Sequence, residues 1–439
     1  IASCLVGSEM CIRDSEYLIM TRNHLLHASV APAAVLASLP LAVGTALADG
    51  FIEDSKASLE LRNFYLNRDF RDGPGQNKRE EWAQGFILNM ESGYTSGTVG
   101  FGLDALAMLG VKLDSSPDRS GTALLPRDSK QRPEDDYSKL GVTAKVRVAE
   151  SVLKAGTLLP KMPTLQFSNS RLLPQTFEGW QVQSKDIERL TASFGQISRV
   201  VQRDVSGSAD LTLNNKNGRF GASPSSDHLR FGGLDYALTP NTQLSYHQGQ
   251  LSDIYRQHFL GLQHTLALGP GKLKADLRYF NNSESGQALA GDIDNQVYNA
   301  MFTYSLAGHA LGVGYQQMRG DDGFTYVNGA TPYLTNFLQL NDFAGPDERS
   351  WQVRYDYDFS KLGIPGLTFM TRYVRGSGID LANGTSGAEW ERNTDLAYAF
   401  SEGPLKNLKV TWRNAVYRAN FTRPMDENRL ILSYALPIW

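Results

Sequence analysis

The sequence predicts an all-β protein, a transmembrane antiparallel β-barrel of about 18 strands. Three observations predict it: apolar and polar side chains alternate with a period of two, aromatic residues gather near the ends of the alternating segments, and tight turns recur along the chain. The composition agrees, because the 439 residues include 41 Gly, 19 Tyr and 20 Phe. A mean hydropathy of −0.33 excludes a bundle of membrane-spanning helices.

The first 48 residues are set apart from this pattern. Arg22 precedes an apolar stretch of small residues at 30–43, and Ala46-Leu47-Ala48 fits a signal-peptidase site. We interpret residues 20–48 as a secretory signal peptide and residues 1–19 as a non-native leader. The barrel domain is then expected over residues 49–439. Both cysteines lie in the leader, so the domain has none.

Three segments show the alternation most clearly. In Trp351–Phe359 every odd position is apolar or aromatic and the even positions before Phe359 are polar, and Lys272–Phe280 and Leu408–Tyr417 repeat the pattern. A soluble sheet alternates too, but here the polar face carries charges of both signs, which a dry core excludes. The final segment, Arg429–Trp439, is apolar on both faces, so its faces are not assigned.

Turns and loops give the strand count. At about 22 residues for a strand and its connection, the domain accommodates about 18 strands. Short periplasmic turns are predicted at Thr239-Pro240-Asn241, Gly269-Pro270-Gly271, Ala307-Gly308-His309, Ile364-Pro365-Gly366 and Gly403-Pro404-Leu405. Long extracellular loops are predicted at Asp114–Tyr137, Leu159–Trp180, Asn281–Gln296, Asp321–Ser350 and Gly376–Ala388.

Charge and motifs exclude several functions. A net charge of −3 argues against nucleic-acid binding by bulk electrostatics. The sequence has no G-x-S-x-G, H-E-x-x-H or P-loop motif, so we expect no catalytic centre, no cofactor and no metal site. The domain is too short for a transporter with a plug and some 22 strands.

Six segments together resemble the OprD-like outer-membrane carboxylate channels. They are Leu61–Arg71, Gly156–Ser184, Gln248–Gln257, Gly320–Phe324, Asn341–Trp351 and Arg413–Leu432. The resemblance implies an 18-stranded barrel in the outer membrane of a Gram-negative bacterium. It also implies that one or more loops fold into the lumen, and that a row of Arg and Lys leads small carboxylates through it. The implied substrates are amino acids, peptides or aromatic acids.

Strand parity locates candidates for this basic row, because lumenal positions lie opposite the aromatic face. An alternative is that these are ordinary lumen charges paired with Asp or Glu. Arg is suited to transient anion sites because its planar fork binds carboxylates bidentately and stays charged. The candidates are Lys145, Arg147, Arg278, Arg354, Arg372, Lys409 and Arg413.

Two loops are candidates for the narrow point of the channel. Loop Leu159–Trp180 is stiffened by three prolines and offers Ser168, Ser170 and Arg171 as donors, although a plain surface loop has the same chemistry. Asp321 and Asp322 are candidates for an acidic counterpart that selects an ammonium group, although acidic pairs in loops are often only solvated.

We therefore expect a substrate-selective porin for passive uptake of small carboxylates. The alternatives are a general diffusion porin and, with less support, an outer-membrane hydrolase. The expected partners are the carboxylate substrates, outer-membrane lipid and lipopolysaccharide, and the barrel assembly machinery during biogenesis. We expect a monomer or a homotrimer.

Overall fold

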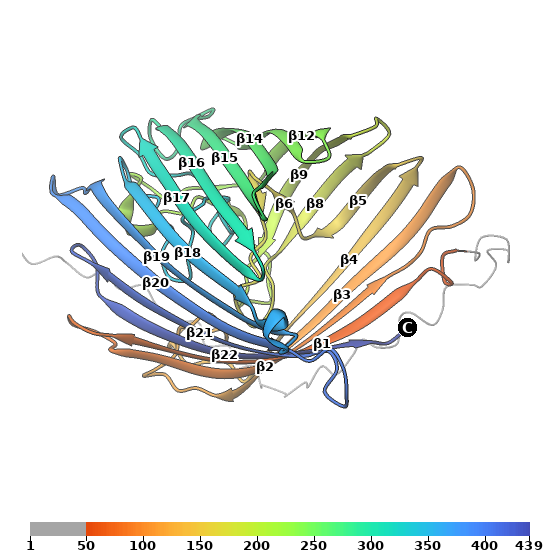
Figure 1. The fold of residues 1–439 in the computed structure, drawn as a ribbon, viewed down its shortest axis with the longest axis horizontal. Coiled ribbons are helices and arrows are strands. Elements are labelled where there is room, and N and C mark those ends of the chain that lie inside the picture. Colours follow the sequence, from red (N-terminus) through yellow and green to blue (C-terminus); the bar gives the residue numbers. More distant parts are fainter. Residues whose placement is uncertain (1–49) are drawn as a thin grey trace, which may run out of the picture. The chain divides into compact units, whose positions relative to one another are not determined.

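The computed structural model describes residues 50–439, and the expected leader and signal peptide lie outside this range. Eighteen strands form one antiparallel sheet (Figure 1). They are β1 (Lys56–Phe70), β2 (Lys78–Glu91), β3 (Val99–Asp114), β4 (Asp136–Val148), β5 (Ser151–Leu158), β8 (Thr176–Ser184), β9 (Leu190–Val201), β12 (Leu229–Thr239), β13 (Thr242–Leu251), β14 (Tyr255–Leu268), β15 (Gly271–Glu284), β16 (Asp294–Leu306), β17 (His309–Arg319), β18 (Arg349–Asp358), β19 (Leu367–Asp380), β20 (Ser386–Ala399), β21 (Leu408–Ala419) and β22 (Met425–Pro437).

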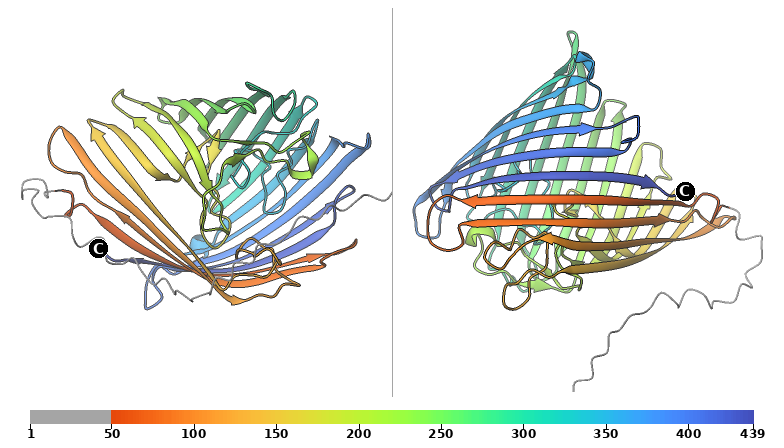
Figure 2. Two further views of the ribbon diagram at one scale, coloured as in Figure 1. Left: turned by 180° about the vertical axis from the view of Figure 1, so that it is seen from behind. Right: turned by 90° about the horizontal axis from the view of Figure 1, so that it is seen from below.

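Each strand pairs with its neighbours along the chain, and β1 pairs with β22 to close the barrel. The right-hand view of Figure 2 shows the last blue strands beside the first orange-red ones. Closure leaves no sheet edge, which a membrane-spanning sheet requires because lipid offers no hydrogen bonds to unpaired backbone groups. The predicted fold class and strand number are confirmed. None of the helices within residues 50–439 is long and apolar enough to cross a membrane.

The two rims of the barrel differ as predicted. All five expected tight turns join strands at the rim where β1 begins and β22 ends, which is the periplasmic rim in outer-membrane barrels. At the other rim the long connections are 115–135, 159–175, 202–228 and 320–348. The loops predicted at Asn281–Gln296 and Gly376–Ala388 are shorter than expected. Strands extend into both, so that the connections are only 285–293 and 381–385. The long loop at 202–228 was not predicted.

Three of the long loops fold into the lumen and contact one another. They contain the small pairs β6 (Lys161–Met162) with β7 (Leu165–Gln166) and β10 (Leu211–Thr212) with β11 (Ser225–Ser226). Two short 3₁₀ turns complete the structure, η2 (Lys216–Gly218) in loop 202–228 and η3 (Phe359–Leu362) in a periplasmic turn. The largest buried apolar cluster lies where these loops meet the barrel wall and includes Met162, Leu213 and Val327. The hydrophobic core therefore fixes the loops inside the barrel rather than filling the barrel.

Candidate functional site

A row of arginines crosses the inner wall of the barrel from β18 to β22. Arg354 on β18 lies directly opposite Arg372 on β19. On β21, Arg413 lies between Asp395 of β20 and Arg429 of β22. Directly opposite residues in an antiparallel sheet have Cβ atoms only about 5 Å apart. Backbone register therefore brings together like charges that are far apart in sequence.

Loops from the opposite side complete a cavity in front of this row. The cavity has a volume of about 350 Å³ and is lined by loops 159–175, 202–228 and 320–348 as well as by the wall. Its charged lining consists of five arginines and one carboxylate, namely Arg171, Arg203, Arg372, Arg413, Arg429 and Asp395. A small anion is the ligand that such a lining favours.

The arginines differ in how far they are neutralised. Arg429 is 2% exposed and donates to Glu427 at 2.6 Å, and Arg413 approaches Asp395 at 3.2 Å. Arg354, beside the cavity, is held by Asp356 at 2.7 Å. Arg372 forms no ion pair among the described residues, and its Nε donates to Asn393 Oδ1 at 2.9 Å. Among the arginines of the barrel wall, Arg372 is therefore the one whose guanidinium is most available for an incoming carboxylate.

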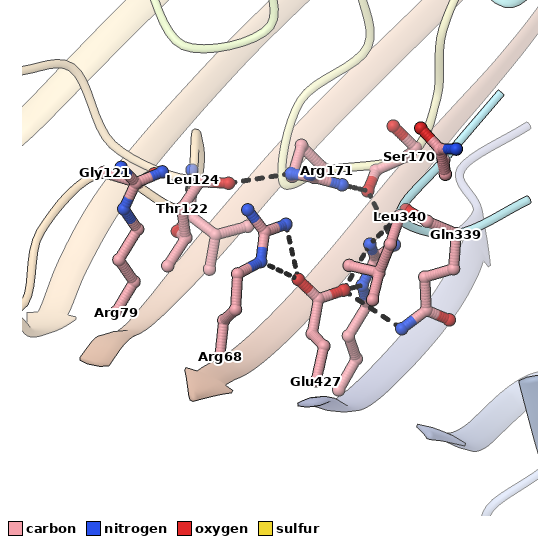
Figure 3. A network of polar contacts seen from close by, with 12 residues as sticks. Arg68, Arg79, Gly121, Thr122, Leu124, Ser170, Arg171, Gln339, Leu340 and Glu427 are labelled. Atoms are coloured by element: carbon pink, nitrogen blue, oxygen red, sulfur yellow. Dashed lines mark hydrogen bonds and ion pairs between the residues drawn. The ribbon is translucent and has the colours of Figure 1, made fainter. Parts of the chain in front are cut away.

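Glu427 connects the wall to the loops (Figure 3). Its buried carboxylate accepts hydrogen bonds from Arg68 of β1 at 2.7 Å and from the side chain of Gln339 at 3.0 Å. Arg429 donates to the main-chain oxygen of Gln339 at 3.3 Å. This network positions Arg429, because both its carboxylate partner and the loop beside it are held by further contacts.

The predicted constriction loop contributes differently from expectation. Ser168 and Ser170 are hydrogen-bonded acceptors for Arg203, at 3.2 and 2.8 Å, so they orient a guanidinium at the cavity. Arg171 donates to the main-chain oxygens of Thr122 and Ser170. Burial, followed by the nearby charge of Arg429, lowers the pKa of the Arg171 guanidinium. An arginine stays charged even so, and the clustering favours an anionic occupant.

Loop 159–175 is fastened to the wall by Arg62 of β1. This side chain is 7% exposed and donates to Asn169 Oδ1 at 2.8 Å and to the main-chain oxygens of Arg171 and Leu172 at 3.0 and 3.2 Å. Glu60 pairs with it at 2.9 Å. Because its contacts fall on both sides of Ser170, Arg62 fixes the part of the loop that lines the cavity.

Four other candidates of the basic row lie away from this cavity. Arg278 pairs with Asp276 at 2.7 Å and stacks on the ring of Tyr333 at 3.8 Å. Lys145 and Arg147 lie near the periplasmic end of β4, where both contact the ring of Tyr94. Lys145 also pairs with Asp104. Lys409 lies at the periplasmic end of β21, opposite Ser433.

Asp321 and Asp322 line a second cavity, of about 500 Å³, at the extracellular side. Its lining includes Lys216 and Arg219 of loop 202–228 together with Asp342. Burial raises the pKa of the Asp322 carboxyl, although the N–H of Asp294 donates to it. The structure does not bring these two carboxylates to the arginine cavity, where the lining carboxylate is Asp395.

Sequence reasoning missed two arginines of the cavity. Arg429 lies in the last strand, whose faces the sequence left unassigned, yet it follows the lumenal parity of Glu427. Arg203 lies in the loop at 202–228, which was not among the predicted loops. Parity around Arg429 could have assigned it to the lumen together with Glu427. In the structure Glu427 and Arg429 are buried, whereas Asn428 and Leu430 between and after them are more exposed.

Among residues 50–439, no group of three or more His, Cys, Asp and Glu side chains is arranged to hold a metal ion.

Comparisons with known proteins agree with this architecture. Residues 49–438 match the model of a family described as outer membrane porin, OprD family. Porin-like protein GalP from Pseudomonas putida is 40% identical over 409 residues, which cover 92% of this chain and 97% of that protein. The crystal structure of OccK5 (OpdH) from Pseudomonas aeruginosa has a TM-score of 0.81 and 58% identity, with 89% of this chain and all of that chain covered. The crystal structure of OpdK with vanillate, from the same species, has a TM-score of 0.84 and 41% identity over the same shares.

Proposed function

This chain belongs to the OprD family of outer membrane porins, and from that premise we propose that it is a substrate-selective channel for small carboxylate-bearing solutes. As a member of this family it is a porin of the Gram-negative outer membrane, and it is a channel rather than an enzyme. The proposal concerns what passes through it: amino acids, peptides or aromatic acids that carry a carboxylate.

The observation that carries the proposal is the charge of the central cavity, where five arginines face one carboxylate. Arginine forks bind carboxylates bidentately, and Arg372 has no competing ion pair. The neighbouring arginines offer further sites, so that a carboxylate moves from one to the next without being trapped at any of them. The vanillate in the structure of the similar OpdK supports this ligand class, because vanillate is an aromatic carboxylate.

Uptake into liposomes tests the proposal. The full barrel is reconstituted, and the entry of radiolabelled benzoate, arginine and a neutral sugar of similar size is followed over a range of concentrations. We expect carboxylate uptake to saturate and to exceed sugar uptake. Entry of all three solutes at rates that follow size alone, without saturation, would instead identify a general diffusion porin.

The proposal also requires that carboxylates compete for the same cavity. Unlabelled benzoate is therefore expected to slow the uptake of labelled arginine, whereas benzamide, which has the same ring but no carboxylate, is expected to have no effect. Equal inhibition by both compounds would contradict a carboxylate site.

A further inference from the structure

The lipid-facing side of strands β18–β21 carries a row in which tryptophan and arginine alternate from strand to strand. Trp351 of β18 lies opposite Arg375 of β19, which in turn lies opposite Trp390 of β20. Trp390 lies opposite Arg418 of β21. We call these four residues the Arg–Trp row. The views of Figures 1 and 2 show its four strands side by side.

The row lies at the outer-leaflet edge of the membrane. Tyr373, one level nearer the membrane centre, packs against Trp351 and Trp390 with ring centroids 5.6 Å apart in each case. Aromatic girdles of this kind mark the two membrane interfaces of outer-membrane barrels, and this one lies toward the long-loop rim. The Arg–Trp row is therefore at the level of the lipid headgroups that face the cell exterior.

The positive charges of this surface are poorly neutralised by the protein. Arg392 is exposed on β20 opposite Tyr373, and its contact is the side-chain oxygen of Asn414 at 3.4 Å. In the part of the chain that the structure describes, Arg375 has no polar partner at all. Arg418 pairs with Asp426 at 2.6 Å, but the same carboxylate also forms an ion pair with Arg71.

The surrounding outward positions offer few counter-ions. Those of β20 and β21 contain no Asp or Glu. Asp380 is opposite Ser386 at the extracellular end of β19, five positions beyond Arg375. A lipid-facing arginine is costly near a membrane unless an anion accompanies it. The positive charge of this surface is therefore best balanced by an anion from the membrane.

We propose that the Arg–Trp row, together with Arg392, binds the phosphate groups of lipopolysaccharide in the outer leaflet. Guanidinium groups bind phosphate bidentately. Arg375 and Arg418 are two strands apart, about 10 Å, so that Trp390 between them offers an apolar face to the lipid while the arginines meet its phosphates. Arg392 lies diagonal to both and adds a third donor group from below.

Native mass spectrometry of the full barrel in detergent, titrated with bis-phosphorylated lipid A, tests this site. The variant carries Arg375→Gln and Arg392→Gln, neither of which lies in the lumen. Loss of two charge-assisted contacts is expected to weaken lipid A binding by about tenfold or more. The matched control carries Arg189→Gln and Lys361→Gln, two exposed cations in the periplasmic connections after β8 and β18, far from the outer leaflet, and is expected to bind as the wild type does.

Two further lipids identify the recognised group. Lipid A without phosphates is expected to bind wild type and variant equally weakly, and phosphatidylglycerol is expected to bind wild type less tightly than lipid A. Equal lipid A affinity in wild type and variant, or wild-type affinity that does not depend on the phosphates, would overturn the proposal, as would phosphatidylglycerol binding as tight as that of lipid A. On wild-type protein alone, these two lipid comparisons can still overturn the proposal if the double variant does not fold.

Discussion

At the scale of single residues, Arg372 is the side chain on which the channel mechanism depends most. The other wall arginines at the cavity each form an ion pair with a carboxylate, whereas Arg372 donates to an amide oxygen. A side chain whose charge is not neutralised attracts an incoming anion more strongly than a paired one does. Replacing Arg372 is therefore the single substitution that tests the carboxylate site most directly.

Arg372→Gln is expected to weaken the block of channel current by benzoate about tenfold, since one charge-assisted contact is lost. Glutamine keeps the size and a donor group, so the wall is expected to stay intact. Current block in planar bilayers measures the affinity directly. Lys409→Gln is the matched control, because Lys409 is a lumen candidate away from the cavity, and an equal loss in both variants would show that general lumen charge, not this site, sets the affinity.

Asp322 gives a pH-dependent prediction. Burial raises the pKa of this carboxyl above its ordinary value, and nearby negative charges add to the rise although the N–H of Asp294 opposes it. Ionising it therefore costs stability, and the cost is complete only above the folded-state pKa. Asp322→Asn is therefore expected to raise the melting temperature slightly at neutral pH, and the gain is expected to disappear as the pH falls through that pKa. Thermal unfolding followed by circular dichroism at several pH values measures it. A gain that is the same at pH 3 and pH 7 would contradict the assignment.

Residue types and parity predicted part of the site from sequence. Alternation placed Arg354, Arg372 and Arg413 opposite the aromatic face, and the structure brings these three into one row. Parity does not predict the height of a residue in the barrel, because height depends on the register between strands. That is why Arg278 and Lys409 were grouped with them although they lie elsewhere.

At the scale of elements, the loops define the cavity as much as the wall does. Loops 202–228 and 320–348 are joined by Arg219 and Asp342, whose side chains are 3% exposed and 2.7 Å apart. The hydroxyl of Tyr326 also donates to Asp342 at 2.7 Å. Farther along, the carboxylate of Glu391 accepts the backbone N–H groups of residues 339–341. Loop 320–348 is thus fixed to a second loop and to the wall.

Asp342→Asn is expected to destabilise the packing of these loops by about 3–5 kcal/mol, because it leaves the buried charge of Arg219 without its counter-ion. Burial alone raises a carboxyl pKa, but Arg219 and Lys216 hold the pKa of Asp342 below its ordinary value. The stabilisation is therefore complete at neutral pH and is lost only as the pH falls through the folded-state pKa. Limited proteolysis of the folded barrel is expected to cut these loops faster in the variant.

Asp321→Asn is the control for this loop experiment, because Asp321 is exposed on the same loop. Unchanged protease resistance in Asp342→Asn would show that the Arg219–Asp342 pair does not hold the loops together.

The elements themselves were predictable where alternation and turn chemistry agree. The five Pro and Gly turns all join barrel strands, since their residues fit tight hairpins and the flanking segments alternate clearly. Loop 202–228 was not predicted although its sequence is rich in Ser, Asn, Asp and Gly, which are loop residues, and the predicted loop Gly376–Ala388 is mostly strand. How loops fold inside a barrel depends on contacts with distant strands, such as Arg62 with residues 169–172, which a local pattern does not contain.

At the scale of the whole molecule, a closed barrel places a charged row on a rigid wall and leaves the loops to narrow the passage in front of it. The wall is rigid because all eighteen strands are paired on both sides. The loops are fastened by buried charged groups and by the apolar cluster where they meet the wall, so they present side chains and main-chain oxygens to the cavity. Selectivity then follows from the surplus of positive charge at that level.

Single-channel recording of the full barrel in a planar bilayer tests this central claim most directly. Benzoate, arginine and a neutral sugar are added in turn, and the same titration is repeated with Arg372→Gln combined with Arg413→Gln. The account predicts resolved conductance steps that benzoate blocks saturably and the sugar does not, with a block at least about tenfold weaker in the double variant. Conductance steps that respond equally to benzoate and to the sugar, in wild type and variant alike, would contradict it.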